Sequence, residues 1–221
     1  SIGSFNSRKH TLKFSTGTRK GFFISGRLSS IQSDGFIDRA RSDLKAFYVS
    51  TGYSKDSNSI IRLNIFSGKE KTYQAWYGLE DPEKLENDRT YNVAGMYTDE
   101  FGNIRYYDNE TDNYQQDHYQ LHWNEKISDK WNTNLAFHYT KGKGYYENYK
   151  EDAAFADYGL TPVGSEVSTD LIRQKWLDND FYGFTSSFNY RKDRLNATLG
   201  GAWNSYEGDH FGEVIWAQFM G

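Results

Sequence analysis

The chain has 221 residues, of which 37% are hydrophobic, 25% charged and 18% aromatic, and its formal net charge is −4. No apolar run approaches the roughly 18 residues of a membrane-spanning helix, which excludes a helical membrane protein. The mixed charges leave no basic face for nucleic acid, and the absence of cysteine excludes disulfides and thiolate metal sites.

Strand-like runs and turns alternate along the whole chain. Short polar turns are predicted at residues 17–20, 55–58, 126–130 and 191–194, and each joins two runs of alternating character. The connections on the opposite side are longer. They are predicted at residues 32–42, 69–113, 142–179 and from 206 onward. Short turns at one edge and long loops at the other are typical of an up-and-down transmembrane β-barrel, whose strands expose only every second residue to lipid.

In the first half of the chain, apolar stripes through Leu12, Ile24 and Leu63 indicate four strands. Arg27 and Arg62 fall on the other side of these strands. A charge that faces lipid at midplane depth costs about 2 to 4 kcal/mol in a barrel, so we expect both arginines to face a polar lumen.

The hairpin over residues 114–141 has the clearest alternation, with His118, His122 and His138 on its polar side. His118 and His122 are four residues apart, about 13 Å along a strand, and cannot bind one ion together. If residue 121 pairs with 135, His118 lies opposite His138, but a metal site would still need a third ligand. We therefore expect three polar histidines that face the lumen, with no metal and no cofactor.

The predicted loops are rich in aromatic residues, which offer contact area and a polar group to a ligand. The alternative is that these rings only pack the loops against each other, and the sequence leaves both open. The acidic run at 108–112 lacks the glycine and final glutamate of a calcium loop, so we expect a solvated loop there. The candidate ligand-binding residues are Tyr73, Trp76, Tyr77, Tyr145, Tyr146 and Tyr149.

Five segments, at residues 33–40, 70–78, 112–119, 142–149 and 209–216, resemble the barrel of TonB-dependent outer-membrane receptors, especially those of Bacteroidetes-type bacteria. The resemblance extends over residues 1–221 and implies part of a 22-stranded barrel in the outer membrane of a Gram-negative bacterium, surrounded by its lipid. Such receptors import ferric siderophores, haem or cobalamin with force supplied by TonB. A surface lipoprotein is a further implied partner.

The chain departs from this pattern because it shows no plug domain, no TonB box and no terminal aromatic strand. We expect a fragment with seven strands and a less clear eighth. No catalytic motif occurs, so we expect no enzyme. Two alternatives stay open, a soluble β-sandwich module that binds carbohydrate or mediates adhesion, and a complete eight-stranded barrel that acts as an adhesin. A sandwich would bury the apolar side of its strands against a second sheet.

Overall fold

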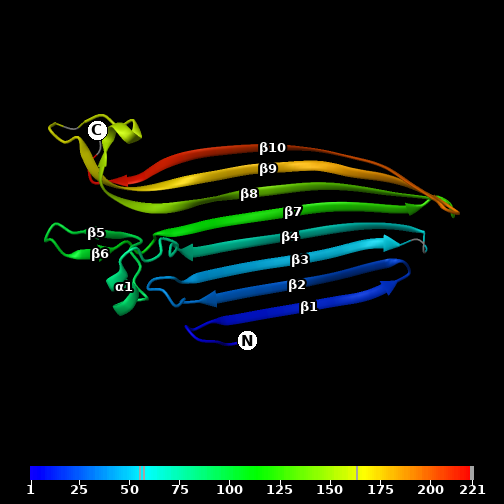
Figure 1. Cartoon of the computed structure of the whole chain (residues 1–221), viewed down its shortest axis with the longest axis horizontal. Helices are drawn as coiled ribbons and strands as arrows, with labels where there is room; N and C mark the ends of the chain where they lie inside the picture. The colour runs from blue at the N-terminus through cyan, green and yellow to red at the C-terminus, as the bar shows by residue number, and fades with distance from the viewer. Residues whose placement is uncertain (55, 57, 163, 220–221) are drawn as a thin grey trace.

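The computed structural model describes residues 1–54, 56, 58–162 and 164–219, and its main feature is one antiparallel sheet of eight strands (Figure 1). The strands follow the order β1-β2-β3-β4-β7-β8-β9-β10, an up-and-down arrangement that is open between its first and last strands. Its strands are β1 (Arg8–Arg19), β2 (Phe22–Ser33), β3 (Ser42–Ser54), β4 (Ser59–Tyr73), β7 (Thr111–Lys126), β8 (Trp131–Ala154), β9 (Ser168–Lys192) and β10 (Leu195–Ala217).

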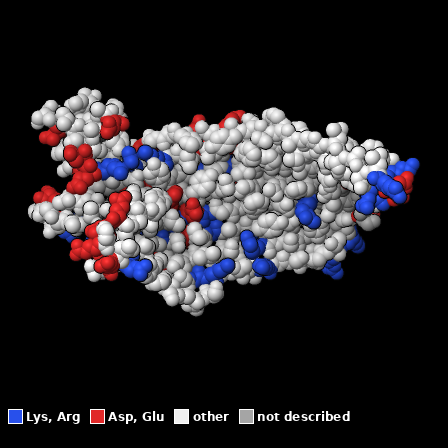
Figure 2. All heavy atoms as spheres, in the orientation of Figure 1, with Lys and Arg blue, Asp and Glu red and all other residues white. Residues whose placement is uncertain are grey.

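The two ends of the sheet differ. At one end, named the turn end, short turns join the strands of the four hairpins. The other end, named the loop end, carries the segment 74–110 with α1 (Pro82–Asn87), β5 (Met96–Thr98) and β6 (Ile104–Tyr106), and the short helix η1 (Phe155–Tyr158). Figure 2 shows that Asp and Glu gather at the loop end, whereas few charged atoms lie along the middle of the visible sheet. The predicted all-β fold with segregated turns and loops is confirmed.

The strands β5 and β6 pair only with each other, as a separate two-stranded sheet. The helix α1 has proline in its first turn and begins after Asp81, whose side chain accepts a 2.9 Å hydrogen bond from the backbone N–H of Glu83. Across the described residues, no helix is both long enough and apolar enough to cross a membrane.

The first turn is shifted from its predicted place at 17–20. Lys20 and Gly21 form it, with φ values of 51° and 85°, as in the type I′ turns that match the twist of two-residue hairpins. Gly17 has φ 64° and lies at an irregularity inside β1. In the second predicted turn, 55–58, residues 55 and 57 lie outside the described part of the chain.

Two of the predicted long loops are largely strands. β8 runs to Ala154 and β9 begins at Ser168, so, of the described residues in the predicted loop 142–179, only 155–162 and 164–167 leave the sheet. β10 likewise continues past Tyr206 to Ala217. The alternation is hard to detect there because both sides of the strands carry polar residues, so the contrast between an apolar and a polar side is lost.

The side chains of the eight-stranded sheet lie on two faces, which follow from the alternation along each strand and from the pairing between strands. Successive residues of a strand point to opposite faces, and directly paired residues share one, so rows of side chains can be followed across the sheet. We name one side the apolar face and the other the polar face. One row of the apolar face is Leu63, Leu121, Phe137, Phe184 and Trp203. One row of the polar face is Asn64, Gln120 and His138.

The apolar face is apolar along only part of each strand. On β8 this stretch extends from Trp131, whose ring is 4.7 Å from that of Tyr190, to Tyr139. Toward the loop end it stops abruptly, because a row of tyrosines is followed by a row of charges. The tyrosine row is Tyr119, Tyr139 and Tyr182, and the charged row is Asp117, Lys141, Asp180 and Glu207.

Two of these tyrosines bond to the charged row. The hydroxyl of Tyr139 donates to Asp180 at 2.6 Å, and that of Tyr182 donates to Glu207 at 3.0 Å. Both hydroxyls therefore point toward the loop end, while their rings remain beside the apolar stretch.

Buried side chains gather at the loop end, and most of them are polar. By contrast, the apolar face is open, since Leu121, Phe137 and Phe188 are 41%, 47% and 48% exposed. The buried side chains at the loop end are Tyr73, Gln74, Asn92, Ala94, Glu110, Thr111, Glu147, Asn148, Phe155, Thr169 and Leu171.

Candidate ligand site at the loop end

Gln74 joins the returning segment 74–110 to the sheet. Its side chain is fully buried, and its Nε2 donates to the carbonyl oxygens of Glu147 at 2.9 Å and Thr111 at 3.4 Å. Its Oε1 accepts a 2.9 Å bond from Asn148 Nδ2. The side chain thus binds both β7 and β8, and it fixes where the segment leaves the sheet.

A second set of bonds holds the segment 74–110 in its folded path. Asn92 Nδ2 donates to the carbonyl oxygens of Asp38 at 3.0 Å and Gln74 at 2.9 Å. The hydroxyl of Tyr73 donates to the carbonyl oxygen of Tyr107 at 2.8 Å. Arg39 lies 3.6 Å over the ring of Tyr106. These contacts make the loop end one ordered polar assembly.

Glu110 is a buried carboxylate in this assembly, with only 3% of its surface exposed. It accepts bonds from Asn148 Nδ2 at 2.7 Å and from the backbone N–H of Tyr149 at 2.9 Å. Burial raises its pKa above the ordinary value, and these two bonds oppose that rise. The expectation that residues 108–112 form a solvated loop is therefore wrong at Glu110.

The raised pKa of Glu110 predicts a loop end that weakens as the pH rises. Because the folded state binds this proton more readily than the unfolded state does, the contribution is fully present below the ordinary pKa of 4.5 and is lost as the pH rises through the raised value. Burial also raises the pKa of Asp112, which adds in the same direction.

This pH dependence can be measured with a fluorophore on the substitution Phe101→Cys, at a position that is 79% exposed in a chain without cysteine. The urea midpoint of the loop end should fall as the pH increases above about 4.5, the ordinary pKa of a glutamate. Glu110→Gln should reduce this slope, because the side chain no longer titrates. A midpoint that rises over the same range would contradict the prediction.

Three cations lie together on the polar face beside this assembly. Lys150 is on β8, and Arg173 and Lys175 are on β9, opposite Asn148 and Tyr146. Burial lowers the pKa of Lys150, the charges of Arg173 and Lys175 lower it further, and the charge of buried Glu110 opposes this shift. The three cations therefore form one field of positive charge.

The field has no anionic partner in contact. Among the described residues, no carboxylate lies within 4.0 Å of Lys150, Arg173 or Lys175. Arg173 donates to the hydroxyl of Tyr158 at 2.9 Å, but its buried Nε has no hydrogen-bond partner. A buried donor without a partner is costly, and an acidic ligand at this place would supply one.

Two of the six predicted aromatic residues lie beside the cations. The Nζ of Lys175 is 5.8 Å from the centre of the Tyr146 ring. Burial raises the pKa of Tyr77. The nearby charges of Glu110 and Tyr146 raise this pKa further, and that of Arg173 lowers it. Tyr77 is 47% exposed and can meet a ligand. The structure thus brings Tyr77 and Tyr146 together with the three cations.

The other four predicted aromatic residues differ in where they lie. The hydroxyl of buried Tyr73 is already bonded within the loop end. Trp76 is 56% exposed, and its ring centre is 6.5 Å from that of Tyr77, so it lies with Tyr77 at the loop end. Tyr145 lies on the apolar face, in the row of Asn113. Tyr149 donates to Asp170 at 2.6 Å. Neither Tyr145 nor Tyr149 is in a loop, because both are in β8.

The conditional pairing of His118 with His138 is wrong by two residues. The register pairs residue 121 with 137, so His118 lies opposite Thr140 and bonds to its hydroxyl at 3.0 Å. His138 lies opposite Gln120. No group of three or more His, Cys, Asp or Glu residues in the described ranges is arranged to hold a metal ion.

Arg27, Arg62 and His122 share the polar face with these histidines, and Arg62 lies directly opposite His122. The guanidinium of Arg62 is 5.5 Å from the centre of the Phe23 ring on the same face. All five polar-face residues predicted from the sequence therefore lie on one side of the sheet.

Comparison with known proteins adds one kind of information, the fold. No protein-family profile and no curated protein matches the chain. Among solved structures, it is similar to the crystal structure of the ferric-catecholate import receptor Fiu from E. coli K12 in its open form. The TM-score is 0.63 and the identity is 13%, over 93% of this chain and 33% of the receptor. The chain thus spans about a third of that receptor's length and has the fold of part of its barrel.

Proposed function

We propose that this chain forms part of the wall of a TonB-dependent outer-membrane receptor, which imports a scarce nutrient of the ferric siderophore, haem or cobalamin class. The observation that carries the proposal is the exposed apolar stretch of the sheet, closed by aromatic rows and then by charges. From Trp131 to Tyr139 it covers about as many residues as the 9 to 11 of a tilted membrane-spanning strand.

In this proposal the apolar face meets lipid and the polar face lines the lumen. Arg27, Arg62, His118, His122 and His138 are then lumen residues. The turn end faces the periplasm and the loop end faces outward, as in barrels with short periplasmic turns and longer external loops. The plug and the segment that contacts TonB would lie outside this chain, and a surface lipoprotein would bind at the loop end.

A soluble β-sandwich would need a second sheet over the apolar face. Within the described residues, the only further sheet is the pair β5 and β6, and it lies at the loop end. Since Leu121, Phe137 and Phe188 remain more than two-fifths exposed, the geometry favours lipid as the neighbour of this face.

Within the nutrient class, the loop end favours a negatively charged iron chelate. Among the described residues, Lys150, Arg173 and Lys175 make no salt bridge, so they provide positive charge to a ligand, and Tyr77 and Tyr146 provide aromatic surface. The similar receptor imports ferric catecholates, which combine an anionic chelate with aromatic rings. Binding and uptake require no chemical step by the protein, so the proposal includes no enzymatic activity.

The proposal is tested with the whole protein in a bacterium that lacks its own copy. The protein should sediment with outer membranes and require detergent for extraction, and it should restore growth when a ferric catecholate is the sole iron source. Leu121→Lys places a charge on the apolar face and should cost about 2 to 4 kcal/mol of barrel stability, measured by unfolding in detergent or lipid.

The matched control is Gln120→Lys, which places the same charge one residue away on the polar face, between Asn64 and His138. It should leave stability nearly unchanged. If both variants are equally stable, or if the wild-type protein is soluble without detergent, the assignment of the two faces is wrong.

A further inference from the structure

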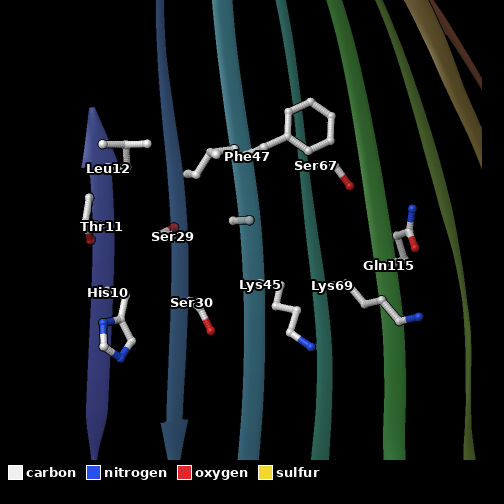
Figure 3. Close-up of a pocket in the computed structure, with 12 residues that line it drawn as sticks. His10, Thr11, Leu12, Ser29, Ser30, Lys45, Phe47, Ser67, Lys69 and Gln115 are labelled. Carbon is white, nitrogen blue, oxygen red and sulfur yellow. The ribbon is translucent and has the colours of Figure 1, made fainter. Parts of the chain in front are cut away.

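A groove of about 560 Å³ crosses the apolar face at the level where its apolar stretch ends (Figure 3). One row of its lining is Leu12, Leu28 and Phe47, on three neighbouring strands. The next row toward the loop end is His10, Ser30, Lys45, Lys69 and Gln115. In Figure 3 the labelled residues of this second row lie side by side on neighbouring strands, with Leu12 and Phe47 on the side nearer the turn end. The groove is thus apolar on one side and cationic on the other.

The cations of this groove are weakly neutralised. Lys45 and Lys69 are directly paired across β3 and β4, and like charges in such positions repel. Lys45 is 3.3 Å from Asp43, but both side chains are well exposed, and such pairs contribute little. Among the described residues, Lys69 has no ion pair. The other nearby acid, Asp117, accepts bonds from Gln115.

The continuation of these two rows on β8 and β9 is different, with Lys143 in the row of Lys45 and Lys69, and Lys141 in the row of Phe47. There, Lys141 contacts Asp178 and Asp180 at 2.6 Å each, and Lys143 contacts Asp178 at 2.8 Å. These lysines are neutralised within the protein, whereas Lys45 and Lys69 are available to an external anion. This contrast supplies a matched control on one surface.

We propose that the groove binds a phosphate-bearing lipid of the surrounding membrane leaflet. The inference rests on the proposed membrane location, which puts the apolar face against lipid. An acyl chain would lie along Leu12, Leu28 and Phe47, and a phosphate would lie between Lys45 and Lys69, where its charge relieves their repulsion. The change from apolar to cationic lining matches the change from acyl chain to headgroup along the lipid.

The test measures lipid binding by native mass spectrometry of the whole protein in detergent, with diphosphoryl lipid A as the probe. Lys45→Gln combined with Lys69→Gln should weaken binding by about 10-fold to 30-fold, as expected for two cations near an anionic headgroup. Lys141→Gln combined with Lys143→Gln removes the same charge from the same two rows of the sheet and should leave lipid binding unchanged. Leu28→Asn should weaken the binding of the lipid without affecting the binding of inorganic phosphate.

Equal lipid binding by the two double variants would overturn the inference. So would full displacement of the lipid by millimolar inorganic phosphate, because the site would then hold a free anion. Nutrient uptake should be unchanged in the Lys45 and Lys69 variant, since these residues lie on the opposite face from the proposed nutrient site. A wild-type protein that binds lipid but imports no iron chelate would contradict the proposed cargo and leave the lipid groove intact.

Discussion

Replacement of Lys150 and Arg173 together by glutamine should weaken the binding of a ferric catecholate to the whole receptor by at least about 100-fold, because each of the two lost charge-assisted hydrogen bonds is worth roughly 1.5 to 3 kcal/mol. The two cations share one field on the polar face, and the buried Nε of Arg173 has no hydrogen-bond partner. Quenching of tryptophan fluorescence in detergent would measure the affinity. Iron uptake at low concentration of the chelate should decrease in parallel.

A matched control lies at the other end of β9, the strand that carries Arg173. Arg191→Gln combined with Lys192→Gln also removes two positive charges, but at the turn end of β9. This variant should bind the chelate normally. Equal loss of affinity in both variants would mean that net charge, and not a site at the loop end, attracts the ligand.

Substitution of Gln74 by leucine should release the segment 74–110 from the sheet. The change keeps the size of the side chain but leaves the carbonyl oxygens of Thr111 and Glu147 without their donor, in a place closed to water. Buried groups that lose their partners cost about 1 to 3 kcal/mol each. We expect a much faster protease cleavage within residues 78–105, and loss of chelate binding, in a barrel that still resists denaturation.

Gln32→Leu serves as the comparison, since Gln32 is exposed at the loop end and makes only a 3.4 Å bond with Asp43. Its cleavage rate should remain that of the wild type. Unchanged cleavage of the Gln74 variant would show that other contacts, such as those of Asn92, hold the segment by themselves.

The sequence was a reliable guide wherever one side of a strand is apolar and the other polar. The apolar stripe through Leu121 and Phe137 predicted the two strands, the face on which each side chain lies, and the hairpin that joins the strands. It did not predict the register, because that depends on how many residues the turn between β7 and β8 holds. Because residue 121 pairs with 137 and not with 135, each histidine of this hairpin lies opposite a residue two positions away from the expected one.

The alternation also continues where both faces are polar, but there it is difficult to recognise. Tyr146, Asn148 and Lys150 repeat with a period of two, as do Arg173 and Lys175 on the next strand. This repetition was the available signal for the cation field. The bond from the Asn148 amide to Gln74 Oε1 joins residues 74 positions apart, and no local pattern could have predicted it.

The bonds from Tyr139 and Tyr182 to the charged row also bear on how the proposed wall sits in a membrane of changing thickness. Each tyrosine ring favours the membrane–water interface, and each hydroxyl is bonded to a carboxylate that needs water. The two tyrosines therefore fix the depth of the sheet in the bilayer. Sliding by one row would draw Asp180 into hydrocarbon. In a thicker or thinner bilayer, the acyl chains next to this sheet should therefore stretch or compress while the protein keeps its position, and hydrophobic mismatch would be absorbed by the lipid.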